Sequence, residues 1–593
     1  MARGGAVSGV LDGLDERQRE AATALRGPVC VLAGAGAGKT RVITHRIAHG
    51  VDTGAYSPNR VMAVTFTTKA AGQMRGRLRA LGVTGVSART FHAAALAQLN
   101  FFWPTVAGDT APAIVDNKVR LLAHAADGIG LDLDTPTLRD VASAIEWRKV
   151  TMRSVEAYAA ARPNGIGRLD VQRVVDLQHA YEKLKDERRQ LDFEDVLLAC
   201  AGMIEAEPRV AQAVREQYRH FTVDEFQDVS PLQHRLLELW LGDRHDLCVV
   251  GDVSQTVYSF AGADASFLLE FSRRHPDARV VRLETSYRCA GPVLEVANEL
   301  MRGRPGALRL QSARDRAASP VPTVTGYPDD AAEARGVAAA VAAQIDAGAD
   351  PRSIAVLYRA HAQSAELLAA LADRQIPATV LGGKRFFDLP EVRQAVLALR
   401  GASVAPTEHG FVDTVRDVLR SVGLTDDPPP AGGALRESWE ARRALLRLAE
   451  EAPPHTTLRT FTDDLLARAK DQHEPAMRTV TLATLHAAKG LEWDHVHLVG
   501  VAEGLLPISY ATTFEQVDEE RRLAYVGVTR AARTLSVTWS RGGARGERSV
   551  SRFVREIGTR TLRVVDADAR PGASTRRSAS PSATRGRAPR PAR

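Results

Sequence analysis

A stretch of thirteen residues, PVCVLAGAGAGKT at positions 28–40, constrains this chain more than any other part of it. Residues 29–32 form a short apolar run that predicts a buried strand, and residues 41–49 continue in a helical pattern. The glycines between them let the backbone turn tightly and point successive N–H groups inward, so such a loop can enclose a polyphosphate. The N-terminus of the following helix adds positive charge for the same anion. We therefore predict a phosphate-binding loop in which Lys39 reaches the β- and γ-phosphates and the Thr40 hydroxyl binds Mg²⁺.

The loop departs from the usual pattern G-x-x-x-x-G-K-[ST] at one position, because Ala33 stands where the first glycine is expected. A glycine-rich turn that merely follows a core strand would account for the same letters. The rest of the chain has to decide between a structural turn and a phosphate site.

Two adjacent acids, Asp224 and Glu225, follow another apolar run at residues 220–223. An aspartate at a strand end can hold Mg²⁺, and a glutamate beside it can orient and deprotonate an attacking water. Adjacent acids are common in loops, so the pair alone is weak evidence. Together with Lys39 and Thr40, the pair supplies the parts that phosphoryl transfer needs.

Apolar runs that end in polar residues recur along the chain in two series. The first series predicts strand-like elements at 29–32, 61–66, 87–92, 220–228, 247–255 and 279–288. The second series begins near residue 323 and predicts strands at 353–359, 378–382, 497–500 and 535–540. In doubly wound sheets ligands bind beyond the carboxyl ends of the strands, so the polar ends of the first series should meet at one edge. The two series predict two α/β domains.

The composition, with 45% apolar and 25% charged residues over 593 positions, is that of a soluble globular protein. Its length predicts about three to five domains. We see no apolar run long enough for a membrane span and no secretory segment at the N-terminus. The scattered cysteines, without a C-x-x-C pair, favour buried thiols in a reducing cytoplasm; they are Cys30, Cys200, Cys248 and Cys289.

The net charge of +7 resides at one end of the chain. Residues 569–593 contain seven arginines and no acidic residue, so the remainder is close to neutral. Because this segment is rich in Pro, Ser, Gly and Arg, it cannot bury a core, and we expect it to be disordered. A solvated end without a role and a segment that binds phosphates non-specifically both agree with this composition.

Nine short strings follow one another in a characteristic order. They are AGAGAGKT (33–40), TFTTKAA (65–71), ARTFH (88–92), DFEDVL (192–197), VDEFQD (223–228), GDVSQTVYSFAGAD (251–264), SYR (286–288), TLHAAKGLEW (484–493) and AYVGVTRA (524–531). Over about residues 14–558 the chain resembles the UvrD/Rep/PcrA-type superfamily I DNA helicases. The string SQTVYSFAGA and a shortened second insertion make it most similar to the second UvrD paralogue of high-GC bacteria.

The resemblance implies an α/β fold of two RecA-like P-loop NTPase domains, each with a mainly helical insertion, followed by a disordered basic C-terminal tail. We expect the first RecA-like domain at 1–105 and 191–281 with its insertion at 106–190, the second at 282–400 and 475–560 with a shortened helical insertion at 401–474, and the tail at 561–593.

The resemblance also implies a set of contacts with ATP. Gln18 matches the glutamine that reads adenine, because a carboxamide donates and accepts hydrogen bonds at once. Tyr287 matches the aromatic residue that stacks on the base, and Glu492 matches the ribose contact. Thr40 and Asp224 form the expected Mg²⁺ site. The loop completes the ATP-binding set with Ala33, Gly34, Ala35, Gly36, Ala37, Gly38, Lys39, Thr40 and Arg41.

For catalysis, the resemblance implies residues from both domains. Lys39 and Glu225 belong to the first domain, where Gln255 matches the γ-phosphate sensor. Arg288 and Arg530 match two arginines that reach the γ-phosphate from the second domain, and guanidinium suits this role because it is always charged and forks onto phosphate oxygens. ATP is therefore expected in the cleft, which is catalytic only when closed. Repeated closing and opening would move the protein along a DNA strand.

Contacts with single-stranded DNA are expected at Phe66, Thr90, Phe91, His92, Phe260 and His486. Stacking on such rings contributes about 1–3 kcal/mol per base and tolerates any sequence. Without the resemblance, core packing would be the simpler interpretation of a phenylalanine at a strand end. The same ambiguity applies to His486 and Trp493. We assign the aromatic cluster at 101–103 to core packing.

Three features depart from the family pattern. Ala261 replaces an arginine beside the base-stacking aromatic residue, which removes one charged link between the ATP site and the DNA strand. Leu389 and Pro390 stand where relatives usually carry arginines. The second insertion is shorter than expected, and because it contacts duplex in the relatives, duplex unwinding is less firmly implied than translocation.

The implied function is an ATP- and Mg²⁺-dependent DNA helicase that moves 3′→5′ on single-stranded DNA in repair or recombination. Its expected partners are single-stranded DNA, junctions of single strand and duplex, and repair or recombination proteins, with no membrane. Two alternatives stay open: an ATPase and translocase that displaces proteins but unwinds poorly alone, and a non-catalytic DNA-binding scaffold. The intact ATP-site residues argue against the scaffold. A nuclease-fused subunit is disfavoured, since the chain leaves no room for a nuclease domain.

Overall fold

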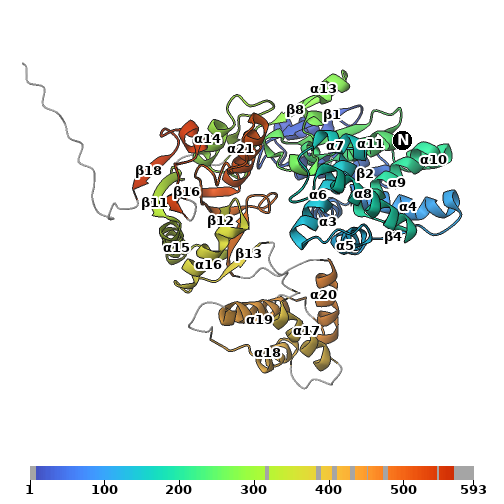
Figure 1. Ribbon diagram of the computed structural model, residues 1–593. Coiled ribbons are helices and arrows are strands. Elements are labelled where there is room, and N and C mark those ends of the chain that lie inside the picture. The colour runs from blue at the N-terminus through green and yellow to red at the C-terminus, as the bar shows by residue number, and fades with distance from the viewer. Residues whose placement is uncertain are drawn as a thin grey trace, which may run out of the picture.

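The computed structural model describes residues 9–313, 319–381, 387, 389–403, 410–427, 434–450, 452–453, 455–471, 478–543 and 546–566. Two large sheets with helices on both faces lie side by side, and a helical body (α17–α20) lies next to them (Figure 1). The predicted α/β fold with two mainly parallel sheets is confirmed.

The first sheet has six strands in the order β3-β2-β6-β7-β1-β8, all parallel to their neighbours. Its inner strands are buried along their whole length, as expected of a parallel sheet covered by helices on both faces. Its strands are β1 (Val29–Ala33), β2 (Val61–Thr65), β3 (Ser87–Thr90), β6 (His220–Val223), β7 (Leu247–Gly251) and β8 (Arg279–Leu283).

Two groups of helices cover this sheet. One face packs against α1 (Glu16–Thr23), α2 (Lys39–Asp52) and α3 (Thr68–Ala80). The other packs against α4 (Phe91–Ala107), α9 (Phe193–Ala206), α10 (Pro208–Gln217) and α11 (Pro231–Leu241), followed by the short α12 (Ser266–Leu269) and α13 (Phe271–Arg274). Because the strands are parallel, their polar carboxyl ends meet at one edge, as predicted from the sequence.

The second sheet runs β13-β14-β12-β15-β16-β11-β18, with β17 antiparallel at the end of β16. Helices α14, α21 and α22 cover one face, and α15 and α16 cover the other. The strands are β11 (Thr323–Asp329), β12 (Ile354–Tyr358), β13 (Ala378–Val380), β14 (Val480–Thr484), β15 (Trp493–Leu498), β16 (Ala531–Gly543), β17 (Gly546–Glu547) and β18 (Arg563–Asp566). The helices are α14 (Gly291–Leu300), α15 (Asp330–Asp346), α16 (Ser364–Ala372), α21 (Phe514–Val528) and α22 (Arg552–Ile557). A two-stranded ladder, β9 (Thr285–Ser286) with β10 (Gln311–Ser312), lies between the sheets in sequence.

A helical insertion interrupts the first sheet and has its own core. It consists of α5 (Lys118–Gly128), α6 (Thr135–Val150), α7 (Val155–Ala161) and α8 (Val171–Glu187). The chain enters through β4 (Ala113–Ile114) and leaves through β5 (Gln190–Leu191), and these two short strands pair with each other.

The second helical body differs from expectation at its start. It comprises α17 (Pro390–Ala402), α18 (Phe411–Ser421), α19 (Ala434–Glu450) and α20 (Leu458–Asp471). The expected boundary at residue 401 is too late, because Val392, Val396 and Leu399 of α17 are buried in one core with α18–α20 rather than against the second sheet. The apolar pattern of α17 predicts that one face is buried, but it does not indicate which core that face joins. The proline run at 428–430 lies outside the described residues.

The sequence prediction places the start of the tail too early, at residue 561. Leu562 is buried, and β18 pairs in parallel with β11, so residues up to Asp566 complete the edge of the second sheet. The basic composition beyond residue 569 obscured this short β-branched segment. Residues 567–593 lie outside the described part of the chain.

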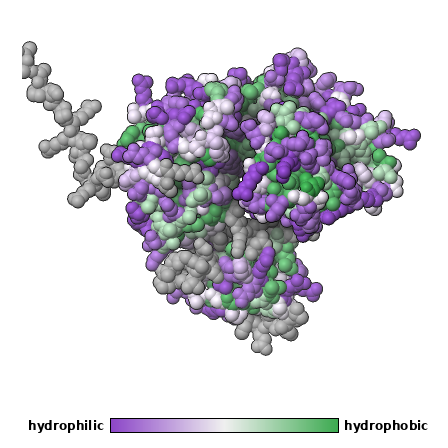
Figure 2. Space-filling model, viewed as in Figure 1, coloured by the Kyte–Doolittle hydropathy of each residue, from purple (hydrophilic) through white to green (hydrophobic). Residues whose placement is uncertain are grey.

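Two other expectations concern side-chain burial. The four cysteines are free and buried, as predicted. The assignment of the 101–103 cluster to the core is wrong for Phe101, which is 75% exposed near the end of α4. Phe102 and Trp103 are partly buried against the first core. No helix in the described ranges is both long and apolar enough to cross a bilayer. Polar residues predominate over the visible face, with smaller apolar areas among them (Figure 2).

Candidate active site between the two sheets

The predicted phosphate loop joins the end of β1 to the start of α2. Gly36 and Gly38 have φ angles of 74° and 84°, in the left-handed region that favours glycine. A Cβ at Gly36 would lie 2.5 Å from Ser286 Oγ and 2.6 Å from Arg288 Cβ, so the loop also needs glycine for space. Ala33, the departure from the motif, is the last residue of β1 and lies in the strand rather than in the turn. The alanine therefore leaves the shape of the loop intact.

Lys39 begins α2 and turns back toward the sheet edge. Its Nζ donates to the Ala33 carbonyl at 3.4 Å and lies 4.0 Å from Glu225 Oε1. The loop lysine and the predicted catalytic acid are thus brought together. The Thr40 side chain, in the first turn of α2, is half-buried beside them.

The acids Asp224 and Glu225 follow β6, and the backbone at Glu225 is strained. Its φ is 52°, an uncommon value for a residue with a side chain, and such strain clusters at functional sites. Burial and the neighbouring Glu225 raise the pKa of Asp224 to about 7. Burial would also raise the pKa of Glu225, but the positive charges of Lys39 and Lys489 bring it down to about 2. Glu225 is therefore ionised at neutral pH, and a cation beside Asp224 would ionise it as well.

A network of side-chain amides fixes the position of Gln255. Its Nε2 donates to Asp252 Oδ2 at 2.7 Å, and the Asp252 N–H donates to Gln227 Oε1 at 3.0 Å. The amide of Gln227 in turn donates to Glu225 Oε2 at 2.6 Å. The predicted sensor residue, Gln255, and Glu225 are therefore joined through one largely buried chain of hydrogen bonds.

The segment after β9 also touches the loop. The Tyr287 N–H donates to the Gly36 carbonyl at 2.9 Å, and the Tyr287 hydroxyl donates to Asp15 Oδ2 at 2.5 Å. Nearby, Gln18 Nε2 donates to the Ala37 carbonyl at 3.0 Å. The predicted adenine-side residues, Gln18 and Tyr287, thus both contact the loop, and both also bond to Asp15.

Arg288 and Arg530 are held by groups of the second sheet. Arg288 Nε donates to Glu492 Oε2 at 2.5 Å. Arg530 is buried, and its guanidinium donates to the carbonyls of Val526 (2.9 Å) and Leu491 (3.0 Å). Burial, with the neighbouring charge of Arg288, lowers the pKa of Arg530 to about 10, so it remains charged at neutral pH. Both guanidinium groups are therefore oriented before any ligand binds.

The predicted DNA-contact residues fall into two groups. Phe260, 62% exposed, meets His486 edge to face with ring centroids 5.8 Å apart. Burial, followed by the positive charge of Arg359, lowers the pKa of His486 to about 4, so its ring is neutral at pH 7. Since Phe260 follows β7 and His486 follows β14, this aromatic pair is built from both halves of the chain.

The second group lies around the start of α4. His92 stacks on Phe193 with centroids 4.0 Å apart, and Phe193 is 56% exposed. The expectation that Phe91 contacts DNA is wrong: it is 1% exposed and stacks on Trp240 in the first core. Core packing is the correct interpretation there, as it is for Trp493 in the second core. Thr90 caps α4 through its hydroxyl, and Phe66 is partly buried against the first core.

Two family models match this chain. The model described as the UvrD/REP helicase N-terminal domain matches residues 14–276, and the model described as the UvrD-like helicase C-terminal domain matches residues 281–405 and 436–542. The chain belongs to the UvrD/Rep helicase family.

Individual members of the UvrD/Rep family show the same likeness. The ATP-dependent DNA helicase UvrD2 of Mycobacterium tuberculosis is 46% identical over 595 residues, covering 96% of this chain and 84% of that protein. DNA helicase II of Escherichia coli is 30% identical, covering 90% and 85%. UvrD1 of Mycobacterium bovis is 29% identical, covering 92% and 85%. The predicted likeness to the second UvrD paralogue of high-GC bacteria is therefore confirmed.

Lys489 of this UvrD/Rep family member is a site residue that the sequence prediction missed. Its ammonium group bonds to the Asp228 carboxylate of the other half and donates to the Gln255 carbonyl at 2.7 Å. Burial raises the pKa of Asp228 to about 6, against the opposing charge of Lys489. The string TLHAAKGLEW contained this lysine, but nothing in the string indicates a partner 261 positions away.

Helix α21 makes further bonds across the interface. Arg522 Nε donates to the Thr256 carbonyl at 2.8 Å, and Glu519 Oε1 accepts from the Ser259 N–H at 3.0 Å. These bonds hold the loop that carries Phe260 and Ala261. They link this loop to the second half of the chain without a charged side chain at position 261.

A Lys489→Met variant tests this interface. Removing the ammonium leaves a buried Asp228 carboxylate unpaired, which is costly. We expect kcat for ATP hydrolysis to fall by roughly tenfold or more, since truncating one partner of a buried charge pair costs a few kcal/mol. Steady-state kinetics against Lys183→Met, a lysine 78% exposed on α8, provide the measurement and its control. Equal kcat values for the two variants would contradict the role.

Proposed function

We propose that this protein is an ATP-dependent DNA helicase that moves 3′→5′ on single-stranded DNA and unwinds duplex in repair or recombination. The observation that carries the proposal is that cations of the second sheet, Arg288 and Lys489, lie against the loop and the acids of the first. One site built from both halves is the arrangement that a nucleotide-driven hinge requires. The names of the relatives, ATP-dependent DNA helicase UvrD2 and DNA helicase II, support ATP and DNA as its ligands.

The residues around the loop divide the work on ATP. Lys39 and the N–H groups of the loop would hold the β- and γ-phosphates, and Glu225 would orient the attacking water and accept its proton. Arg288 and Arg530 would stabilise the charge that develops on the transferred phosphoryl group. Gln18 and Tyr287 would hold the adenine, and Glu492 the ribose.

The donor set also fits Mg²⁺. Thr40 and Asp224 would hold the ion, which supplies charge neutralisation on the phosphates. Magnesium is commonly bound by one or two carboxylates together with substrate phosphates, rather than by a cage of protein ligands.

The DNA strand is proposed to run over the exposed aromatic rings. Phe260 with His486 and Phe193 with His92 offer two stacked or edge-to-face pairs. Phe66, which meets Phe91 edge to face, is a further proposed contact. Base stacking on such rings is independent of sequence. Because Phe260 and His486 belong to different halves, a change in the interface would change their grip on the strand. We also propose that the protein acts in the cytoplasm, with repair or recombination proteins as candidate partners.

A second candidate is a translocase that displaces proteins from DNA but unwinds poorly alone. The observation that favours it is the small second helical body, whose four helices span residues 390–471. A scaffold without catalysis is disfavoured by the pre-oriented cations and acids. The helicase and the translocase differ in what they do to duplex, not in how they use ATP.

The decisive experiment measures ATP hydrolysis with single-stranded DNA, duplex, RNA and no nucleic acid. We expect stimulation by single-stranded DNA of at least about tenfold, since strand binding aligns a site shared by two halves. Displacement assays on duplexes with a 3′ or a 5′ single-stranded tail then test polarity and unwinding. Absence of ATP turnover with single-stranded DNA would favour the scaffold, and turnover without displacement would favour the translocase.

A further inference from the structure

The first turn of α9, within the string DFEDVL, carries three acids around one exposed aromatic residue. Asp192 caps the helix by accepting from the Asp195 N–H at 3.0 Å, and Glu194 lies between them. The Phe193 ring points elsewhere, being 56% exposed and stacked on His92. The carboxylates and the aromatic ring of this turn therefore serve two different surfaces.

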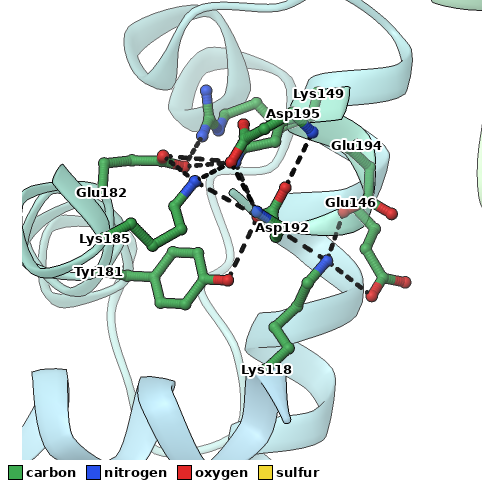
Figure 3. A network of polar contacts seen from close by, with 10 residues as sticks. Lys118, Glu146, Lys149, Tyr181, Glu182, Lys185, Asp192, Glu194 and Asp195 are labelled. Carbon is green, nitrogen blue, oxygen red and sulfur yellow. Dashed lines mark hydrogen bonds and ion pairs between the residues drawn. The ribbon is translucent and has the colours of Figure 1, made fainter. Parts of the chain in front are cut away.

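Three lysines meet these acids, one from each of three insertion helices. Figure 3 shows Lys118 of α5, Lys149 of α6 and Lys185 of α8 around the Asp192 carboxylate. Asp192 Oδ2 lies 2.8 Å from Lys149 Nζ, 3.5 Å from Lys185 Nζ and 4.0 Å from Lys118 Nζ. It also accepts from the Tyr181 hydroxyl at 3.2 Å. The Asp192 carboxylate, at the start of α9, thus contacts three of the insertion helices, α5, α6 and α8.

Each lysine has a second acid in the same turn. Lys118 Nζ lies 2.5 Å from Glu194 Oε2, Lys149 Nζ lies 2.7 Å from Asp195 Oδ1, and Lys185 also pairs with Asp195. Glu146 and Glu182 of the insertion complete the cluster. Because every lysine keeps a partner when Asp192 is neutralised, the loss of that one charge should loosen the cluster without unfolding it.

The centre of the cluster is buried, and the neighbouring charges keep its groups ionised. The side chains of Lys149 and Lys185 are 3% exposed, and that of Asp192 is 1% exposed. Burial alone would raise the pKa of Asp192, but the three lysines hold it below its ordinary value. Burial opposes the charge of Lys149, yet the surrounding acids raise its pKa above its ordinary value. Buried ion pairs often add little net stability, and their best-attested use is to specify one geometry.

The same end of α6 also approaches the other aromatic surface. A Cβ at Gly262 would lie 2.5 Å from Val150 Cγ2, so the residue after Lys149 packs against the turn that follows Phe260. The cluster therefore lies between the two aromatic surfaces that we propose to contact DNA.

We propose that these acids and lysines form an ionic joint that fixes the helical insertion to α9 and so holds Phe193 in place to stack on a base. Asp192 is the central positioning residue of this joint. The inference rests on the proposed function, because it takes single-stranded DNA as the ligand of Phe193.

Asp192→Asn tests the joint, since asparagine keeps the helix cap but removes the charge at its centre. Asp170→Asn is the matched control. Asp170 caps α8 by accepting from the Arg173 N–H at 2.8 Å, is exposed, and has no ion pair among the described residues. The readout is the concentration of a dT oligonucleotide that gives half-maximal ATPase rate.

We expect Asp192→Asn to raise this concentration about tenfold, the size of one lost stacking contact, with kcat and the KM for ATP within about twofold of wild type. Asp170→Asn should match the wild type. An unchanged oligonucleotide requirement in Asp192→Asn, or a matching rise in Asp170→Asn, would overturn the proposal.

A double-mutant cycle with Phe193→Ala shows whether the joint acts through Phe193. If it does, adding Asp192→Asn to Phe193→Ala raises the oligonucleotide requirement little further. Effects that multiply would assign the joint a merely structural role. Should Asp192→Asn fail to fold, Lys118→Gln at the edge of the joint, with a 14% exposed side chain, takes its place with the same expectations.

ATPase measurements on the wild type distinguish a failure of the proposed joint from a failure of the proposed function. If single-stranded DNA does not stimulate the wild-type ATPase, the proposed function fails. The joint is then judged by direct binding of a fluorescein-labelled dT oligonucleotide to wild type, Asp192→Asn and Phe193→Ala. Equal affinities, or no binding by the wild type, would overturn the joint as well.

Discussion

A Lys39→Ala variant is expected to hydrolyse ATP at least about 10²-fold more slowly than the wild type at saturating single-stranded DNA, the cost of removing one pre-oriented charge from a phosphoryl-transfer site. Lys39 begins α2 and lies 4.0 Å from Glu225, whose pKa it helps to hold low. Its loss would remove the proposed phosphate contact and part of the positive charge that keeps Glu225, the proposed catalytic base, ionised. Measurement of kcat over a range of ATP concentrations tests the expectation.

Binding of single-stranded DNA should be nearly unchanged in Lys39→Ala, because the exposed rings of Phe260 and Phe193 stand apart from the loop in sequence and belong to other elements. Lys183→Ala, which removes an exposed lysine of the insertion, controls for the loss of a positive charge. A variant that loses DNA binding or its thermal unfolding transition along with hydrolysis would show that Lys39 supports the fold instead.

Arg530→Lys is expected to reduce kcat by roughly 10³-fold, in the range found for arginines that stabilise phosphoryl transfer, while changing the affinity for ATP by less than about tenfold. The guanidinium is held by the Val526 and Leu491 carbonyls, so its remaining N–H groups have a fixed direction. Lysine keeps a charge but loses the planar fork, and it cannot satisfy both carbonyls while reaching a phosphate.

Arg533 provides the matched control for Arg530, since it lies three residues later with a side chain that is 64% exposed. Arg533→Lys should behave as the wild type in hydrolysis and in thermal unfolding. Equal losses of kcat and of ATP affinity in Arg530→Lys would contradict a role confined to the transition state.

The phosphate loop and the paired acids were predictable because their signals are local. The string GAGAGKT after an apolar run predicts the turn. An acid directly after a strand falls at the edge of a parallel sheet where ligands bind, independently of distant parts of the sequence. Ala33 departs from the sequence motif but not from its structure. It is the last residue of β1, so it leaves the turn unaffected.

The exposure of aromatic residues was not predictable in the same way. Phe91 and His92 are neighbours in one string, yet Phe91 points into the core against Trp240 while His92 meets Phe193 at the surface. Which of two adjacent residues is buried depends on where the helix that they begin is packed. That packing is set by elements far along the chain.

The interface contact of Lys489 and the packing of α17 could not be predicted, for a related reason. A lysine in a matched string has no sequence signal for the Asp228 that it meets across the interface. Likewise α17 comes soon after β13 of the second sheet in sequence but packs with α18–α20. Contacts between segments that are far apart in the chain leave no repeating pattern in the local sequence. Only the structure reveals them.

The burial of all four cysteines makes the proposed hinge between the two sheets accessible to spectroscopy. Burial raises the pKa of Cys30 and of Cys200 to about 12 and raises those of Cys248 and Cys289, so reactive thiolate is scarce at neutral pH. Cysteines introduced at exposed positions of the two sheets should therefore take up maleimide dyes against a dark native background. Energy transfer between such a pair would report, in an otherwise unaltered chain, the separation of the two sheets during each cycle of ATP use.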